Sequence, residues 1–356
     1  MMYSRLHKKY YAKRVFLSVV FLVVTAHLSS GENIEEQPGY LKSELIFPLD
    51  DKPTPNCHAS TIVANKEREL VTSWFGGTEE GNPDVDIWVS RYAGGKWSKP
   101  VEAANGEWVL GRRFPCWNPV LFQPRNGPLL LFFKVGPSPR DWWGEWMISE
   151  DGGKTWNDRQ CLPKGGIGPV KNKPIQLQDG TILCPSSSEH DGWRVHFERT
   201  ADLGKTWEII GPLPADQEFQ VIQPCILTYP DGRMQVLCRT KNKKVIAQSW
   251  SQDGGTTWSP VAATELPNPN SGIDAVTLSD GRQLVVYNPI TKGRNILSVA
   301  ISADGAKWKE VMKLEEETDG EFSYPAVIQT ADDRVHITYT YNRVSIKHVV
   351  IDPKIF

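Results

Sequence analysis

Side chains that could do chemistry recur at one place in six similar segments of the chain. Each segment is an apolar stretch broken by a polar turn, and a polar or reactive residue stands just before it or at its start: His58, Asn118, Lys173, Gln223, Asp274 and Tyr324. Four of these six are followed directly by Pro, which suits the first residue of a strand. A phenol, an imidazole and a carboxylate brought together could transfer protons or attack an electrophilic carbon. The alternative is that the first residues of these strands are exposed to solvent and tolerate any polar side chain.

Charged side chains follow the same segments, in the loops beyond them. The carboxylates are Glu79, Glu80 and Asp84, and the guanidinium groups belong to Arg113, Arg140, Arg239 and Arg294. Arginine can bind a carboxylate through two parallel hydrogen bonds, so this set favours an anionic ligand. Any single arginine is as often held in a structural ion pair, and only the cluster points to a site.

Other chemistries have no signature in the chain. No Gly-rich phosphate loop, dinucleotide fingerprint or Gly-x-Ser-x-Gly motif is present. The histidines at 190, 196, 336 and 348 stand at no metal-ligand spacing, so we expect no metal and no cofactor. A net charge of −2 argues against nucleic acid as the main partner.

The six segments have the pattern of β-hairpins. They span residues 60–74, 119–133, 174–184, 224–238, 275–287 and 325–339. Asp-Gly or Asn-Gly stands at the turn of four of them, and such a dipeptide between apolar runs is the strongest short-range hairpin signal. The turns follow one another at roughly 50 residues, a period typical of repeat architectures.

A second motif keeps the same period. It reads Ser149-Glu-Asp-Gly-Gly-Lys-Thr-Trp156 and recurs at 200–207, 251–258 and 302–308, with a degenerate copy at 90–97. The motif resembles the Asp-box (BNR) repeat, in which Ser or Thr and Asp lock a tight turn and Trp packs between strands. We therefore assign these turns a structural role and no chemistry.

Six units of hairpin, third strand and Asp-box turn predict an all-β fold, a six-bladed β-propeller with Asp-box turns. The last unit lacks a fourth strand, and residues 41–47 are expected to supply it and close the ring. The propeller domain is assigned to residues 40–356. The alternative, a β-sandwich with a second domain, does not explain the constant period. In a propeller the inner strands start at the mouth of the channel, so the candidate residues would converge there.

The first 31 residues have the pattern of a signal peptide. A basic stretch precedes the apolar run 15–28, and small residues follow it. The run is short for a membrane span, so we expect a secreted or periplasmic protein with no stable span after signal removal; a retained signal anchor is the alternative. Among six cysteines, Cys225 and Cys238 are expected to oppose each other across a hairpin as free thiols.

Asp-boxes on a six-bladed propeller resemble the sialidase (neuraminidase) superfamily, and the resemblance covers essentially all of residues 45–351. In that family three arginines hold the sugar carboxylate, a Tyr activated by a Glu is the nucleophile, and an Asp of the first blade is the acid/base. The resemblance implies that Arg239 and Arg294 are two of the arginines and that Tyr324 is the nucleophile. Arg113, Arg140 or Lys173 would complete the carboxylate site, with Asn118 and Gln223 as further substrate-binding residues.

The sequence departs from that family's pattern at three positions. His58 stands in place of the first blade's Arg-Ile-Pro motif. Gln223 stands where the family has its Glu, 16 residues before the second arginine, and a Gln cannot act as a base. The acid/base Asp has no clean match; Glu79, Glu80 or Asp84 could replace it, and Asp274 or His58 could assist Tyr324.

The leading hypothesis is an exported exo-glycosidase that hydrolyses the bond of a terminal carboxylated sugar, such as sialic acid, on a glycan or glycoconjugate. Its catalytic candidates are Tyr324, Glu80, Glu79, His58 and Asp274. One alternative is a polysaccharide lyase acting on uronate-containing glycans, with His58 and Tyr324 moving protons. Another is a carbohydrate-binding propeller without catalysis.

The chain has 14 tryptophans, and five of them belong to the Asp-box turns. Another five, at 74, 88, 146, 193 and 250, are expected to pack between blades. Trp108, Trp117, Trp142 and Trp143 remain as candidates for stacking on a sugar ring.

Overall fold

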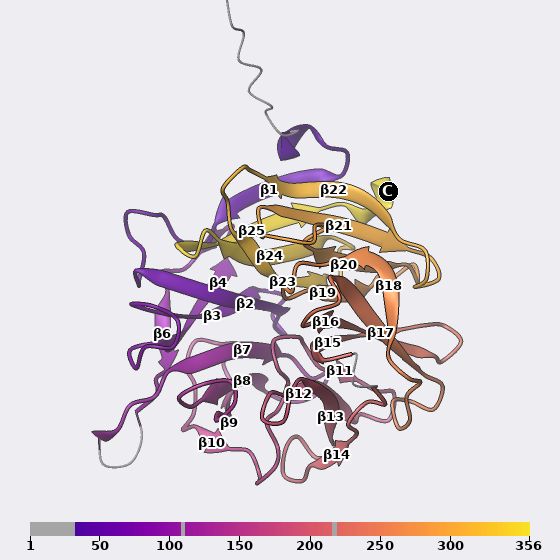
Figure 1. Ribbon diagram of the computed structural model, residues 1–356. Helices are drawn as coiled ribbons and strands as arrows, with labels where there is room; N and C mark the ends of the chain where they lie inside the picture. The colour runs from indigo at the N-terminus through magenta and orange to yellow at the C-terminus, as the bar shows by residue number, and fades with distance from the viewer. Residues whose placement is uncertain (1–32, 108–110, 216–218) are drawn as a thin grey trace, which may run out of the picture. The chain divides into compact units, whose positions relative to one another are not determined.

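The computed structural model describes residues 33–107, 111–215 and 219–356. The predicted signal peptide and Trp108 lie outside these residues. Strands in the described residues form six antiparallel sheets that follow one another around a common centre (Figure 1). Two short 3-10 helices, η1 (Ile34–Glu36) and η3 (Pro353–Ile355), stand at the two ends of this part. No helix in the described ranges is long and apolar enough to span a membrane.

The first three blades take up residues 56–210. Blade 1 contains β2 (Asn56–Ala64), β3 (Leu70–Gly77), β4 (Asp86–Ala93), β5 (Lys96–Trp97) and β6 (Val101–Ala104). Blade 2 contains β7 (Cys116–Phe122), β8 (Leu129–Val135), β9 (Trp143–Ser149) and β10 (Gln160–Cys161). Blade 3 contains β11 (Ile175–Gln176), β12 (Ile182–Ser188), β13 (Arg194–Thr200) and β14 (Glu208–Ile210).

The other three blades complete the ring. Blade 4 contains β15 (Val221–Thr228), β16 (Met234–Thr240), β17 (Val245–Ser251) and β18 (Ala262–Pro267). Blade 5 contains β19 (Asp274–Thr277), β20 (Gln283–Tyr287), β21 (Ile296–Ser302) and β22 (Lys309–Glu316). Blade 6 contains β23 (Phe322–Gln329), β24 (Val335–Tyr341), β25 (Ser345–Ile351) and β1 (Tyr40–Leu45). The prediction of a six-bladed propeller is confirmed.

Ring closure uses the strand predicted from residues 41–47. β1 pairs antiparallel with β25, so the first strand of the chain is the outer strand of the last blade. Such pairing joins the two ends of the propeller domain in one sheet.

Asp-box turns are held by side chain to backbone hydrogen bonds. In the copy at 251–258, Ser251 Oγ accepts from the Gly255 amide at 2.9 Å, and Asp253 Oδ1 accepts from the Thr257 amide at 2.9 Å. The hydroxyl and the amide of Thr257 both donate to Asp253 and lower its pKa to about 2, because they stabilise the charged form. The Trp that ends the turn stacks on the preceding blade: Trp258 lies 4.5 Å from Phe197, with the rings 13° from parallel. These contacts confirm the structural role assigned to the motif.

Four inner strands carry a β-bulge at the same level. The register shifts in β2, β7, β15 and β23, and one residue in each bulge has a left-handed φ: Ala59 (56°), Asn118 (40°), Gln223 (54°) and Tyr324 (52°). A bulge re-aims a side chain, at a cost on the order of 1 kcal/mol for each left-handed residue other than glycine. The equivalent of Tyr324 in blade 1 is therefore Ala59. The prediction that His58 and Tyr324 hold equivalent positions in their blades is wrong by one residue. Blade 1 lacks the proline that follows the bulge residue in β7, β15 and β23.

Cys225 does not oppose Cys238, and that prediction is wrong. Cys225 pairs with Leu237 across the hairpin, because three residues, not two, separate Tyr229 from Arg233 in the turn. Gly232 takes the left-handed conformation that ends such a turn, with φ of 87°. Both cysteines are buried free thiols.

Two stacked histidines join the closing strand to its blade. His336 Nδ1 and His348 Nε2 are 3.0 Å apart with the rings 7° from parallel, and His348 Nδ1 lies 3.3 Å from Glu44 Oε1 on β1. Burial and the neighbouring His348 lower the pKa of His336 to about 4. Burial is also the main cause that lowers the pKa of His348, against the opposing effect of Glu44.

We expect these histidines to make the fold sensitive to acid. The unfolded chain binds a proton on His336 near pH 6.5, whereas the folded chain binds it only near pH 4. The contribution of neutral His336 to the free energy of unfolding is therefore complete above pH 6.5. It is lost as the pH falls towards 4, by on the order of 2 kcal/mol. Urea unfolding at pH 7 and pH 5 should show a smaller loss of stability for His336→Gln than for the wild type. Equal losses in the two proteins would contradict this.

Candidate active site

Tyr324 lies at the mouth of the channel on the bulge of β23. Its side chain is mostly buried, and the His58 ring packs against its ring with centroids 4.2 Å apart. The guanidinium carbons of Arg239 and Arg294 lie 5.7 and 5.5 Å from the same ring. The phenol is therefore surrounded by residues from blades 1, 4 and 5, three of which the sequence predicted as site residues.

The phenol oxygen of Tyr324 faces hydrogen-bond donors. Arg239 Nη1 donates to it at 2.6 Å, and Gln223 Nε2 lies 3.4 Å away. Arg239 Nη1 also lies 3.3 Å from Gln223 Oε1, so the amide and the guanidinium fix each other. Gln223 cannot remove the phenol proton, but both donors stabilise negative charge on this oxygen.

Asn270 connects two of the arginines. Its Oδ1 accepts from Arg239 Nε at 2.6 Å, and its backbone oxygen accepts from Arg294 Nη2 at 3.4 Å. Asn270 precedes β19 and has a left-handed φ of 64°, which Asn tolerates better than most residues. Sequence reasoning missed this residue, because it lies in a loop without a repeated pattern.

Arg343 is a third arginine at the mouth, and it was not among the predicted site residues. It lies in the three-residue turn between β24 and β25, where both Asn342 and Arg343 have left-handed φ and the Val344 amide donates to Tyr341 O at 3.0 Å. Its Nε donates to Glu321 Oε1 at 3.0 Å. Arg294 Nη1 is 3.2 Å from the same oxygen, so Glu321 bridges the two arginines.

The predicted carboxylates of blade 1 occupy the exposed loop between β3 and β4. Glu80 joins the cluster, since its Oε2 lies 2.6 Å from Arg343 Nη1. Asp84 caps the same loop by accepting from the Thr78 amide at 3.0 Å. Glu79 is exposed, and its backbone oxygen accepts from the Asn82 amide at 3.0 Å.

His58 is a buried neutral imidazole. Burial, reinforced by nearby arginines and Lys171, lowers its pKa well below the usual value. Its Nδ1 lies 2.9 Å from Thr340 Oγ1, which also accepts from the Ala59 amide at 3.1 Å. His58 thus adds no positive charge to the site at neutral pH.

Lys171 is a buried lysine before β11 that contacts blades 5 and 6. Its Nζ donates to the backbone oxygens of Ile273, at 2.7 Å, and Pro325. Burial lowers its pKa to about 8. A Cβ on Gly272 would lie 3.2 Å from Tyr324 Cγ and 3.3 Å from Lys171 Cε, so a larger residue there would press on both side chains. Sequence reasoning missed Lys171 too.

Lys173 and Asp274 are engaged with each other. Lys173 Nζ lies 2.8 Å from Asp274 Oδ2, which also accepts from the Val327 amide at 2.8 Å. The pair ties blades 3, 5 and 6 together. These two predicted site residues therefore join blades to one another, and neither is bound to the phenol of Tyr324.

The remaining predicted residues lie apart from the hydrogen-bonded cluster. Arg113 binds the buried Asp86 through both carboxylate oxygens, at 2.7 and 2.5 Å. Despite that partner, burial raises the pKa of Asp86 to about 6. Arg140 lies in an exposed turn of blade 2, and Asn118 is buried at the bulge of β7.

The tryptophan predictions divide in the same way. Trp117 and Trp142 are buried against each other, with centroids 6.1 Å apart, and Trp143 is half-buried. Trp193, which was expected to pack between blades, stands in blade 3 and lies against Arg239 of blade 4. Its ring is partly exposed and lies 5.1 Å from the guanidinium carbon of Arg239, because it stands at the hairpin tip before β13.

The cluster carries an excess of positive charge. Three arginines and Lys171 face the two carboxylates Glu321 and Glu80, while His58 is neutral. Guanidinium groups from blades 4, 5 and 6 converge beside one phenol, an arrangement suited to a carboxylate-bearing ligand.

Six blades, four of them with a complete Asp-box turn, around an arginine-rich mouth with a central tyrosine define a propeller of the sialidase type. The chain belongs to the family of the BNR repeat-like domain, whose model matches residues 68–337. No curated protein matches the sequence.

Solved structures share the fold at low sequence identity. The Hadza microbial sialidase Hz136 is 16% identical with a TM-score of 0.74, over 88% of this chain and 68% of that one. A protein of unknown function from Dyadobacter fermentans is 17% identical with a TM-score of 0.73, over 89% and 99%. The intramolecular trans-sialidase of Ruminococcus gnavus is 14% identical with a TM-score of 0.70, over 87% and 97%. At such identities the likeness establishes the fold.

Proposed function

We propose that this protein is an exo-glycosidase that cleaves the bond of a terminal carboxylated sugar, sialic acid or a related acidic sugar, on a glycan. The observation that carries the proposal is the convergence of Arg239, Arg294 and Arg343 around Tyr324. The guanidinium groups hold the sugar carboxylate, which fixes the anomeric carbon beside the phenol oxygen. We further propose that residues 1–31 direct export, so that the enzyme acts on glycans outside the cytoplasm.

In the proposed reaction Tyr324 releases its hydroxyl proton to solvent water, and its oxygen bonds to the anomeric carbon while the bond from that carbon to the leaving oxygen breaks. Arg239 and Gln223 stabilise the phenolate before attack and again when it departs. The leaving oxygen takes a proton from an acid, and water then hydrolyses the tyrosyl intermediate to release the sugar. Glu80 is held in an ion pair with Arg343, so we assign the proton donation to Glu79.

Glu79→Gln and Glu80→Gln form a matched pair that tests this assignment. Without its acid the enzyme must expel an unprotonated leaving group, so Glu79→Gln should lower kcat on alkyl glycosides about 100-fold and on nitrophenyl glycosides much less. Glu80→Gln should mainly raise KM, because it releases Arg343. Steady-state kinetics with both kinds of leaving group check this. A fall in kcat for Glu80→Gln and a rise in KM for Glu79→Gln would show that Glu80 is the acid.

A second candidate reaction is β-elimination on a uronate. It is favoured by the surroundings of the phenol oxygen of Tyr324. The two donors to this oxygen are Arg239 and Gln223, and Gln223 stands where hydrolytic relatives are expected to have a Glu. A phenolate there could remove the proton beside a carboxylate that the arginines neutralise.

A panel of acidic-sugar glycosides and uronate polymers separates these reactions. Hydrolysis releases a reducing acidic sugar, whereas elimination creates a double bond that absorbs in the ultraviolet. The proposal predicts the first product. Binding of acidic glycans without either product would leave a carbohydrate-binding propeller and contradict the enzyme assignment.

A further inference from the structure

The degenerate Asp-box at 90–97 does not pack on its neighbouring blade as complete copies do. In complete copies a glycine of the turn lies against the preceding blade. A Cβ at that glycine would lie 3.2 Å from Val71 (Gly153), 3.1 Å from Trp146 (Gly204) and 2.8 Å from Leu183 (Gly255). At Gly94 and Gly95 of blade 1 it would meet nothing within 4 Å. A space therefore remains at the junction of blades 1 and 6.

A pocket of about 500 Å³ occupies this junction. Its walls come from the β2–β3 turn and the β23–β24 turn, together with Tyr92 of β4 and His336 of β24, and we call it the distal pocket. β2 runs from His58 at the mouth to Ala64 at this pocket, a strand length of roughly 20 Å. The distal pocket is therefore on the opposite face from Tyr324, and its volume lies within the range of small-ligand sites.

A chain of hydrogen bonds leaves a lone pair on His336, which lines the distal pocket. Glu44 pairs with Lys42 at 2.8 Å and only accepts hydrogen bonds, so His348 Nδ1 carries the proton between His348 and Glu44. Burial lowers the pKa of both histidines, so both are neutral at pH 7. His348 Nε2 therefore accepts, and His336 Nδ1 donates to it at 3.0 Å. His336 Nε2 is left as an acceptor, and no group of the described residues donates to it.

Two charged side chains add further open groups to the distal pocket. Asp332 Oδ1 accepts from the Thr330 hydroxyl and from the Arg334 amide, whereas its Oδ2 accepts no hydrogen bond from the described residues. Arg68 is exposed, and its guanidinium forms no ion pair with the described residues. The lining thus offers two open acceptors and a cationic donor, and the charges of Arg68 and Asp332 balance.

This pattern of charge selects the ligand. An anion would face the Asp332 carboxylate and the lone pair of His336. A cation would face Arg68, with Lys42 Nζ also 4.7 Å from the centroid of the Tyr92 ring. A neutral group with several hydroxyls suits all three open groups, since it donates to two acceptors and accepts from the guanidinium.

We propose that the distal pocket binds a neutral sugar residue, at a second site on the face of the propeller opposite the arginine cluster. His336 Nε2 and Asp332 Oδ2 accept from sugar hydroxyls, and Arg68 donates to a sugar oxygen. The apolar side chain of Leu70 lies in the same wall and packs against C–H groups of the ring. The inference goes beyond the proposed function, because this site holds neutral glycans without catalysis.

Histidine-selective ¹⁵N NMR tests the site at its central residue. The probes are the neutral disaccharides lactose, cellobiose and maltose. We expect at least one of them to shift the His336 Nε2 signal, which His336→Gln assigns, and to leave the signal of His190 in place. His190 is exposed before β13, far along the chain from the distal pocket, so it reports on sugar bound elsewhere.

Two turn variants measure the contribution of the charged groups. Arg68→Gly removes the guanidinium, and glycine takes the φ of 63° without strain. Asp332→Asn keeps Oδ1 for the turn and replaces Oδ2 by a donor. Each variant should lower the affinity for the sugar about tenfold.

Matched controls for these variants are Lys66→Ala and Asp231→Asn. Lys66 is exposed in the same turn as Arg68, and Asp231 accepts from the Arg233 amide at 3.1 Å in the corresponding turn of blade 4. Both should bind the sugar like the wild type.

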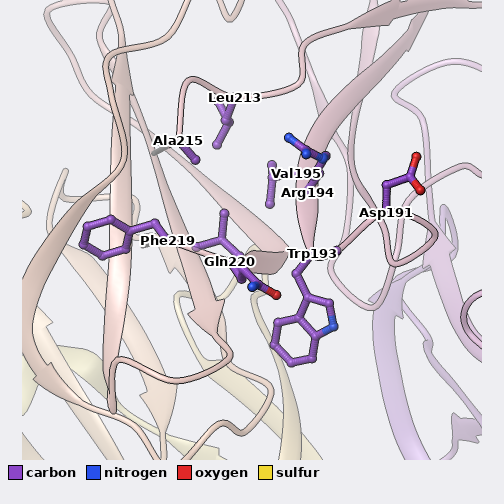
Figure 2. A pocket seen from close by; sticks show the side chains of 10 residues that line it. Asp191, Trp193, Arg194, Val195, Leu213, Ala215, Phe219 and Gln220 are labelled. Atoms are coloured by element: carbon purple, nitrogen blue, oxygen red, sulfur yellow. The ribbon is translucent and has the colours of Figure 1, made fainter. Parts of the chain in front are cut away.

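A pocket of about 410 Å³ beside Arg239, lined by Trp193 and Gln220, must be told apart from the distal pocket (Figure 2). Loss of sugar binding in Trp193→Ala, with normal binding in Arg68→Gly and Asp332→Asn, would overturn the proposal. So would a His336 signal that none of the three disaccharides shifts, or one that only inorganic phosphate or Zn²⁺ shifts. None of these measurements requires turnover, so failure of the proposed function would leave their outcome unchanged.

Discussion

Tyr324→Phe should abolish turnover, with kcat reduced 1000-fold or more, while the fold and the affinity for acidic sugars change little. The substitution removes only the oxygen that would bond to the anomeric carbon. The ring keeps its contact with His58, and Arg239 keeps Asn270 and Gln223 as partners. Single-turnover kinetics and calorimetric titration with the acidic sugar measure the two effects separately.

Tyr229→Phe is the matched control for this variant. Its hydroxyl donates to Gln235 Oε1 at 2.5 Å within the hairpin of blade 4, and it is not part of the cluster. Its kcat should equal that of the wild type. If Tyr324→Phe kept more than a tenth of the wild-type kcat, the phenol would not be the nucleophile.

Arg239→Ala should have the second-largest effect, because this side chain meets both the ligand and the nucleophile. We expect kcat/KM to fall 100- to 1000-fold and the affinity for an acidic sugar to fall about 100-fold, as for loss of one partner in a buried charged pair. The loss should be much smaller for an analogue with a carboxamide in place of the carboxylate. Titration of both ligands against both proteins measures this difference.

Arg199→Ala is the control for the arginine variant, since Arg199 forms an outer-strand ion pair with Glu208 at 2.8 Å. It should bind both ligands like the wild type. Equal losses of affinity for the carboxylate and the carboxamide ligand in Arg239→Ala would contradict this. They would show that the guanidinium maintains the shape of the site and does not recognise the charge of the ligand.

The architecture could be predicted because it repeats. Each turn dipeptide and each Asp-box is a local signal, and their common period gave the number of blades and the closure by β1. Where the prediction failed, a single residue of register decided the outcome. The three-residue turn at Tyr229–Arg233 moved Cys225 away from Cys238, and the bulge at Ala59 moved His58 out of line with Tyr324.

The candidate site could be predicted only in part. Tyr324, Arg239 and Gln223 were found because they stand at fixed places in the repeat, and the structure brings them within hydrogen-bond distance. Arg343, Asn270 and Lys171 belong to turns and irregular segments that come together only when the ring closes. No local pattern marks such contacts, because their partners are from about 30 to 260 residues away in the chain.

A crystal structure of Tyr324→Phe with a bound acidic oligosaccharide would test the central claim most directly. We predict that the sugar carboxylate lies within hydrogen-bond distance of the guanidinium groups of Arg239 and Arg294, with the anomeric carbon facing the position of the missing oxygen. A carboxylate held elsewhere on the propeller, with these arginines still bound to Asn270 and Glu321 and no ligand between them, would contradict the account.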